Sequence, residues 1–576
     1  MNKKIAFILA FMFFILVVSF IFIKFHFLKA KDFKPDTSKK KSIVDLRPDI
    51  IAKLQQLVKD GSNGLYILSI EKINPDVLAS KLDVVNASIS IDSTVMRQLD
   101  HLKKLPDDIF KIHFNSLHID GIGITDLLEK KRLDITSINI SHPVIEVYHH
   151  LRVYNKPVRE RNDTLSLYHR LKGQMNQIGI GKINIESGTF INYADADKRN
   201  VTRINNITVH INELLIDSST QFDANRFLFA KHAMIDARNY MVPIPDSLYY
   251  FKTGAITILA EQHKIILLNV DFCPRGNRKQ FESKLQFRKD MYHIVLPKVI
   301  LYDVDWWAMM NHEKFIAKKG DISGGSFKIF FDKSLPANPV IKADNFPQQL
   351  LMKIPLSVSI TNLNLKNVNV SYEEYNPKAK QSGVVIFDVL NARVNNVSNI
   401  GADIKKHPVA DFSANGLFMH HIPMRARFTF NLSKYKTGDF TADITMDTLD
   451  KPVITSFAEP LGLFSVKTGE LQHGIAHIEG NNSDAKGKVA ISYSNLYINP
   501  LKKAGNDGVL KKKHLTGLIA NVFLIKNENP AKGNQLRQPV YSVKRDHHSN
   551  FFNLIWITIL TGILKTIGIP VKFVIH

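Results

Sequence analysis

Residues 363–370 read LNLKNVNV, a stretch in which apolar side chains stand two apart, then three apart, then two apart. The apolar residues are Leu363, Leu365, Val368 and Val370. A spacing of two places side chains on one face of a β-strand, and the step of three indicates a bulge or tight turn before the pattern resumes. This stretch therefore predicts a strand with one apolar face and an interruption in its middle.

The same spacing of apolar residues occurs six times along the chain. The other five sets are Leu117, Ile119, Ile122 and Ile124; Ile138, Ile140, Pro143 and Ile145; Ile183, Ile185, Gly188 and Phe190; Ile294, Leu296, Val299 and Leu301; and Ile491, Tyr493, Leu496 and Ile498. Because the intervals between the sets are irregular, the pattern is a quasi-repeat of strand pairs and not a fixed-period solenoid. We therefore predict a mainly β fold, an extended and twisted antiparallel sheet or groove with one apolar face.

Only a few short helices are expected beside the strands. Pro48 in an early position and Gly61 after the end predict a helix near the start of the body. A second helix is expected to begin at Ser93, and a third to run from about Asp163 to Met175. These helices are too few to cover a long sheet.

The apolar face of such a sheet needs a partner. Roughly 25 to 30 strands paired serially at about 4.8 Å would form a sheet on the order of 120 to 145 Å long. It either folds on itself as a sandwich or holds something apolar, for which acyl chains are the natural candidate. The residues expected to line a lipid groove are Ile138, Ile140, Ile183, Ile185, Phe190, Val299, Leu301, Leu363, Leu365, Val368, Val370, Ile491, Tyr493, Leu496 and Ile498. For any one of them taken singly, a place in a structural core is favoured over contact with lipid, because a sandwich and a groove have the same alternation.

An unbroken apolar run, IAFILAFMFFILVVSFIFI, occupies residues 5–23. It is long enough to span a bilayer and no clear cleavage site follows it, so we predict an uncleaved N-terminal transmembrane helix. The flank at 24–41 carries more lysines than the flank before the run, and the positive-inside rule alone would keep the body in the cytoplasm. Long domains can nevertheless translocate despite such a flank.

The C-terminal segment has apolar residues at helical spacing. These are Phe552, Trp556, Ile559, Ile563 and Ile567. The opposite side holds a threonine or a lysine at positions 558, 561, 565 and 566, so the pattern predicts an amphipathic helix. Such a helix either caps the apolar end of the sheet or inserts into a membrane interface, where the five apolar residues are the contact candidates.

Composition limits the class of protein. Of the 576 residues, 45% are hydrophobic and 22% charged, as expected of a chain whose bulk folds in water. The formal net charge of +23 favours contact with anionic surfaces. Lysines are spread through every segment and form neither an Arg-rich helix nor a stacking platform, which disfavours nucleic acid. The single cysteine, Cys273, excludes an intrachain disulfide framework.

No catalytic signature is recognisable in the sequence. Adjacent histidines at 149–150, 420–421 and 547–548 lack the spacing and flanking carboxylates of a metal site. The GIG triplets at 121–123 and 179–181 lack the third glycine of a dinucleotide loop, and no GxxxxGK[ST] or GxSxG motif is present. We expect a protein that is not an enzyme and uses no metal or cofactor.

Several stretches together resemble a known family. They are the N-terminal apolar run, GKINIESGTFINY at 181–193, SLYYFKTGAITI at 247–258, and a block with GEL at 469–471 and GKVAISYSNLYI at 487–498. In this order they resemble the AsmA-like branch of bacterial proteins, built of repeating β-groove units and related to chorein-type bridge-like lipid-transfer proteins. The chain is modest in length for a protein that would bridge an envelope alone.

The resemblance implies an inner-membrane protein of a Gram-negative envelope, with a single-pass anchor and its bulk in the periplasm. It also implies movement of phospholipids or support of outer-membrane integrity, with the phospholipid membrane, lipid acyl chains and envelope proteins as partners. We divide the chain into an anchor and flank at 1–31, a helix-capped β region at 32–180, a middle β-groove region at 181–350, a C-terminal β-groove region at 351–548 and a terminal helix and tail at 549–576.

Two other functions remain to be weighed. A structural or assembly factor of the envelope would have a closed β-sandwich body and no open groove. An outer-membrane barrel fits the alternating strands, but it fits poorly with an uncleaved N-terminal span and heavily charged polar faces.

Overall fold

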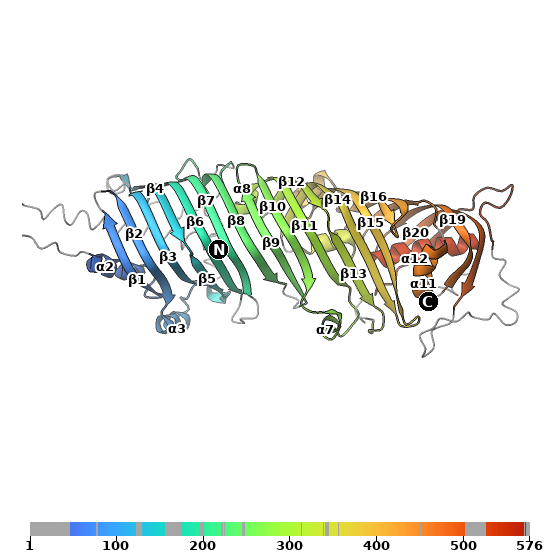
Figure 1. The fold of residues 1–576 in the computed structure, drawn as a ribbon, viewed down its shortest axis with the longest axis horizontal. Coiled ribbons are helices and arrows are strands. Elements are labelled where there is room, and N and C mark those ends of the chain that lie inside the picture. The colour runs from blue at the N-terminus through green and yellow to red at the C-terminus, as the bar shows by residue number, and fades with distance from the viewer. Residues whose placement is uncertain are drawn as a thin grey trace, which may run out of the picture. The chain divides into compact units, whose positions relative to one another are not determined.

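A computed structural model describes residues 47–569 and 571, apart from 77–78, 123–129, 156–174, 195–200, 221–222, 224, 228, 245–247, 313, 338, 340–344, 355, 450, 463 and 502–525. The described residues form 21 strands of one large twisted sheet and a few short helices (Figure 1). The mainly β prediction is therefore confirmed. The described residues thus account for 21 of the roughly 25 to 30 strands expected of the whole chain.

The chain divides into two compact units, Met1–Pro245 with Phe251–Leu267, and Asp246–Tyr250 with Leu268–His576. The elements of unit 1 are α2 (Arg47–Gly61), β1 (Tyr66–Asp76), β2 (Lys81–Ile91), α3 (Ser93–His101), β3 (Asp108–Ile122), β4 (Arg132–Ser141), β5 (Val144–His149), a short 3-10 helix (Val153–Asn155), β6 (Gln177–Ala194), β7 (Val201–Ile216) and β8 (Ala230–Pro243). Strands β9 (Tyr249–Leu259) and β10 (Lys264–Pro274) each contain a point where the chain passes between the units.

Unit 2 holds the remaining elements. They are α7 (Arg278–Glu282), β11 (Met291–Val304), α8 (Trp306–Asn311), β12 (Lys314–Ser323), β13 (Ser326–Asp332), α9 (Pro347–Met352), β14 (Ser357–Asn376), β15 (Gln381–Ser398), α10 (Gly401–Lys406), β16 (Val409–Phe418), β17 (Ile422–Asn431), β18 (Phe440–Met446), α11 (Lys451–Gly462), β19 (Phe464–Gly480), β20 (Asp484–Pro500), β21 (Val540–Lys544) and α12 (Phe551–Ile567).

The two helices predicted at the start of the body are present as α2 and α3. Asp92 caps α3, since its carboxylate accepts hydrogen bonds from the backbone N–H groups of Thr94 and Val95. The predicted anchor at 5–23 and residues 163–174 of the third predicted helix lie outside the described residues. Within the described ranges, no helix combines the length and apolar character needed to cross a bilayer.

The sheet is mixed, so the prediction of a wholly antiparallel sheet is wrong. In unit 1, β4 and β5 lie end to end, antiparallel to β3 on one side and parallel to β6 on the other. In unit 2, β12 and β13 stand in the same relation to β11 and β14. Apolar alternation is the same in both kinds of pairing, and the sequence pattern therefore did not distinguish them.

These two sets of strands form an internal structural repeat. Strands β11 to β15 follow the pairing pattern of β3 to β7, and each begins 180 to 183 residues after its counterpart. The matched strands also carry their irregularities at matching places, as Ser187 in β6 and Asn367 in β14 both have positive φ, 54° and 55°. A single architecture is thus used twice in the chain.

The sequence pattern predicts a bulge or tight turn at each three-residue step, and the backbone is irregular at or beside these steps, with bulges in β6, β14 and β20 and the passage from β4 to β5 at His142. Gly121, His142, Ser187, Asn367 and Asn495 stand at the step of five of the six sets, and all have positive φ between 49° and 65°. Register shifts accompany the step in β6, β14 and β20. In the sixth set, on β11, the irregularity lies instead at Gly324 and Gly325, between the two strands β12 and β13 that pair with β11. The extra residue returns the following side chains to the face they would otherwise leave.

The helix predicted at the C-terminus is present as α12, but three of the four residues expected on its polar side are buried, and only Lys565 is exposed. Thr558, Thr561 and Thr566 are 0%, 4% and 1% exposed, whereas Phe552 is 55% exposed. The hydroxyls of Thr558 and Thr566 donate to the carbonyl oxygens of Leu554 and Gly562, both at 2.7 Å. Because this bond satisfies the hydroxyl within the helix, threonine can enter a core.

The bulge at Asn367 gives a direct test of backbone strain. Asn367 is exposed and left-handed, so Asn367→Val is expected to lower the free energy of unfolding by about 1–3 kcal/mol, and Asn367→Gly by under about 0.5 kcal/mol. Urea unfolding measures both. Lys366→Val, at an exposed neighbour that is not left-handed, is the control; an equal loss there would show that strain at the bulge is not the cause.

Candidate functional site

The apolar face of unit 1 is continuous across neighbouring strands. Ile138 of β4 stands beside Ile119 of β3 and Ile183 of β6, and Ile183 stands beside Ile211 of β7. One row along, Ile140 lies between Leu117 and Ile185. Directly paired residues project to the same side of a sheet, so these positions form an apolar strip that runs across the strands.

The same construction is found in unit 2. Leu363 of β14 pairs with Gly320 of β12 and Val394 of β15. Leu365 pairs with Ile322 and Ala392 in the next row. Beyond the bulge, Val370 pairs with Phe327 of β13 and Phe387 of β15. On β11, Leu301 and Val299 continue the rows of Leu363 and Leu365. The register thus brings Val299, Leu301 and the set of β14 onto one face.

Exposure differs along these strips. Ile138 and Ile140 are 0% and 3% exposed, and Ile183 is also buried, while Ile185 and Phe190 are half-buried. In unit 2, Val299, Leu301 and Val368 are buried. Leu363, Leu365 and Val370 are half-buried, as are Phe387 and Val394 beside them. The face around β14 and β15 is therefore less completely covered than the strip of unit 1.

The C-terminal candidates lie under helices. Ile491, Tyr493 and Leu496 of β20 belong to a buried cluster that contains residues of α11 and α12, and Ile498 packs against it. The Tyr493 hydroxyl donates to the carbonyl oxygen of Lys526 at 2.9 Å. Figure 1 shows α11 and α12 beside the last strands of unit 2. These helices, and not an open groove, contact this end of the apolar face.

Four of the five predicted membrane-contact residues of α12 face the protein. Trp556, Ile559 and Ile563 pack against the C-terminal cluster, and Ile567 is fully buried. Only Phe552 is largely exposed. The fit of the helix depends on Gly562, where an added Cβ would lie 2.6 Å from the Cβ of Val489 on β20.

A polar group bounds the apolar strip at the far end of β14. Glu374 is 5% exposed and pairs with Lys333, whose Nζ lies 2.5 Å from Oε1. The Tyr372 hydroxyl donates to Oε2 of Glu374 at 2.8 Å. Burial, with the nearby carboxylates of Glu374 and Asp290, raises the pKa of Tyr372 well above its ordinary value. A neutral tyrosine and a paired carboxylate thus mark where the apolar surface ends.

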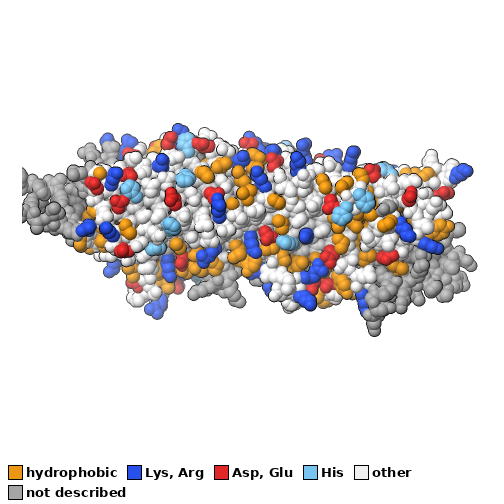
Figure 2. Space-filling model, viewed as in Figure 1, with side chains coloured by type: hydrophobic (Ala, Val, Ile, Leu, Met, Phe, Trp, Pro, Cys, Tyr) orange, Lys and Arg blue, Asp and Glu red, His pale blue; other side chains and the backbone are white. Residues whose placement is uncertain are grey.

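The opposite face of the sheet carries charged side chains, and Figure 2 shows histidines among acidic and basic residues on one side of the molecule. His118 of β3 lies between Asp83, its neighbour on β2, and Asp120, whose Oδ2 is 2.8 Å from Nε2. The hydrogen bond to Asp83 is the main cause that raises the pKa of His118. His477 of unit 2 lies in the same way between Asp443, 2.6 Å away, and Glu479.

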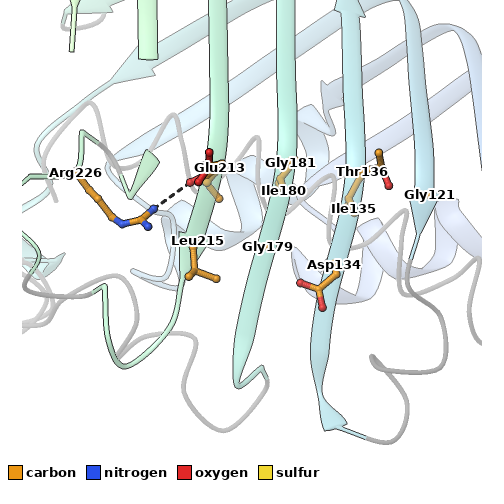
Figure 3. Close-up of a pocket in the computed structure, with 11 residues that line it drawn as sticks. Gly121, Asp134, Ile135, Thr136, Gly179, Ile180, Gly181, Glu213, Leu215 and Arg226 are labelled. Atoms are coloured by element: carbon orange, nitrogen blue, oxygen red, sulfur yellow. Dashed lines mark hydrogen bonds between the residues drawn. The ribbon is translucent and has the colours of Figure 1, made fainter. Parts of the chain in front are cut away.

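A shallow pocket of about 360 Å³ lies on this polar face of unit 1 (Figure 3). Gly121, Thr136, Gly181 and Glu213 occur one on each of four adjacent strands, and the backbone of Gly121 and Glu213 has positive φ, 65° and 52°. Missing side chains at the glycines leave the depression. The guanidinium of Arg226 donates to the carbonyl oxygen of Glu213 at 3.0 Å across one end of it. The pocket therefore lies where glycines on neighbouring strands leave the backbone uncovered.

Sequence reasoning missed the roles of α11, Lys333 and the carboxylate-bound histidines. Of these, only the histidines could have been recognised in the sequence. His118 stands two residues before Asp120, and His477 two before Glu479, so each pair lies on one face of a strand. The described residues hold no cluster of histidine, cysteine, aspartate and glutamate side chains suited to a metal ion. No protein-family model and no curated protein matches the chain.

The packing of α12 against β20 can be tested at Gly562. Gly562→Ala is expected to lower the free energy of unfolding by about 1–3 kcal/mol, because the new methyl group meets Val489 and Tyr541 in a packed core. Thermal or urea unfolding measures this loss. Gly401→Ala on α10 is the control, since an added Cβ there meets nothing within 4 Å; a similar loss in both variants would contradict the packing account.

The histidine between two carboxylates predicts a pH dependence. Since the pKa of His118 is raised in the folded state, its stabilising effect is fully present below its unfolded pKa, near 6.5, and is lost as pH rises through the folded pKa. His118→Gln should therefore lower the free energy of unfolding more at pH 6 than at pH 8.5. The difference between the two losses should be less than about 1 kcal/mol, because His118 and its carboxylate partners are partly solvated. His101→Gln serves as control, and a loss independent of pH would exclude the charge interaction.

Proposed function

We propose that this protein binds phospholipids through the apolar face of its sheet and moves them along it. The observation that carries the proposal is the incompletely covered face around β14 and β15, where paired rows of half-buried aliphatic and aromatic side chains succeed one another. In a closed core such residues would be buried on all sides. A surface of this kind accepts acyl chains while head groups stay in water.

The energy of such binding comes from removing hydrocarbon from water. Burial of one methylene contributes about 0.8 kcal/mol, so burying about ten methylenes of one lipid contributes about 8 kcal/mol before the costs of ordering. No covalent step is required for this function. Lysines distributed over the chain, with its net charge of +23, would attract the anionic head groups that remain outside.

The location that we propose follows from the sequence. The apolar run at residues 5–23 would anchor the chain in the inner membrane of a Gram-negative cell, with the sheet in the periplasm. There it would support the integrity of the outer membrane as an AsmA-like protein that is not an enzyme and needs no cofactor. Lipids of the membrane, and envelope proteins, would be its partners.

One observation favours a different function. Helices α11 and α12 cover the apolar face at the last strands of unit 2, as expected of a closed structural body. A structural or assembly factor of the envelope would need no open strip elsewhere. The two functions differ in whether the folded protein carries lipid.

Native mass spectrometry of the full chain in mild detergent distinguishes them, with two neighbouring substitutions that each add one negative charge. Val370→Asp places the charge on the apolar face, whereas Asn369→Asp places it on the opposite face and keeps the acceptor for the N–H of Val389. We expect phospholipids on the parent and on Asn369→Asp, and roughly tenfold less on Val370→Asp.

Circular dichroism checks that all three proteins are folded. If the folded parent carries no phospholipid, or if the two variants retain it equally, the apolar face is not a lipid site. The structural role would then be the better account.

A further inference from the structure

Three large apolar side chains are exposed close together beside the start of β14. Leu350 of α9 is 50% exposed, and Ile354 and Leu356 in the following loop are 44% and 46% exposed. On a protein surface, apolar side chains that gather in this way mark an interaction site more often than single ones do. The nearby elements determine what kind of partner fits.

Asn399 makes several hydrogen bonds to the loop that carries Ile354 and Leu356. Asn399, just after β15, donates from its side-chain amide to the carbonyl oxygens of Leu351, Ile354 and Leu356, at 3.3, 3.4 and 2.9 Å. Its Oδ1 accepts from the N–H of Val358 at 2.7 Å. These hydrogen bonds fix the backbone of the loop, while the side chains of Ile354 and Leu356 remain exposed to solvent.

The other side of α9 is fixed to the body of unit 2. Gln349 is 1% exposed, and its amide donates to the carbonyl oxygen of Tyr435 and to Oδ1 of Asn482, both at 2.9 Å. Leu350, the next residue, is therefore displayed outward by a helix that has little freedom to turn. A fixed display of this kind lowers the entropy lost when a partner binds.

Exposed lysines lie on two elements that adjoin α9 and the loop after it. Helix α10 begins two residues after Asn399 and ends with Lys405 and Lys406, both exposed. The turn that Gln349 contacts carries Lys434 and Lys436 on either side of Tyr435, and both are exposed. The acidic residue of α10, Asp403, is only half-exposed. On α10 and this turn, the fully exposed charged side chains are therefore all lysines.

We propose that this surface, the docking edge of Leu350, Ile354, Leu356, Lys405, Lys406 and Lys434, binds the interface of an anionic phospholipid bilayer. Aliphatic side chains would enter the boundary between head groups and acyl chains, and lysines would contact the head groups. A protein partner would be expected to meet aromatic and arginine side chains, which this edge does not present. The inference does not depend on lipid moving along the sheet.

The test uses the full chain held in nanodiscs of phosphatidylcholine. The only native cysteine, Cys273, is buried, so Ile354→Cys can be labelled with a fluorophore that responds to an apolar environment. Vesicles of phosphatidylcholine are added, either alone or with roughly one third phosphatidylglycerol. Val540→Cys on β21, 59% exposed, reports on a second site of the same unit.

We expect the label at 354 to brighten and shift to the blue with anionic vesicles only, and the label at 540 to stay unchanged. The triple variant Lys405→Glu, Lys406→Glu, Lys434→Glu should require roughly tenfold more vesicles, and 1 M salt should have a similar effect.

Failure of the label at 354 to respond in a folded protein, an equal response at 540, or a response unchanged by the three substitutions would overturn the proposal. A response to an acidic protein in place of anionic vesicles would do the same. Native mass spectrometry of the triple variant distinguishes failure of this proposal from failure of the proposed lipid binding by the sheet. The amount of lipid that the sheet retains should be the same in the triple variant as in the parent.

Discussion

The structure depends on how a long strand keeps its apolar side chains on one side. Strict alternation would allow this without a break, but the sequence steps by three at six places, and a flat strand would then send the following residues to the opposite face. A residue with left-handed backbone at five of the six steps, such as Asn367 or Ser187, corrects the direction. The bulges also increase the local twist of the strands, so continuity of the apolar face and twist of the sheet have the same origin.

Much of this could be predicted from spacing alone. The period of two, the step of three and the position of the bulge are local properties, and each was readable at Leu363 to Val370. The parallel pairing of β4 with β6 and of β12 with β14 was not readable, because the direction of pairing does not change the alternation of apolar residues. The repeat of about 180 residues was hidden for a related reason: its matched positions, Ser187 and Asn367, share a backbone angle and not a side chain.

The site was only partly predictable, because burial is decided by tertiary packing. The same alternating pattern describes Tyr493, enclosed under α12, and Leu365, half-buried on β14. The faces of α12 were misjudged because threonine counts as polar in a helical pattern, yet Thr558 bonds within its own helix and packs inward. Conversely, Ile354 and Leu356 are exposed in a loop that has no secondary-structure pattern, and the hydrogen bonds of Asn399 fix the backbone that carries them.

The central claim is that lipid contacts one face of β14 and not the other. Photocrosslinking tests it most directly: a benzoylphenylalanine is placed at Leu365, or at Lys366 on the opposite face, and the protein is irradiated in cells before mass spectrometry of the labelled peptide. The account predicts a phospholipid adduct at 365 and none at 366. Adducts at both positions, or at neither, would contradict it.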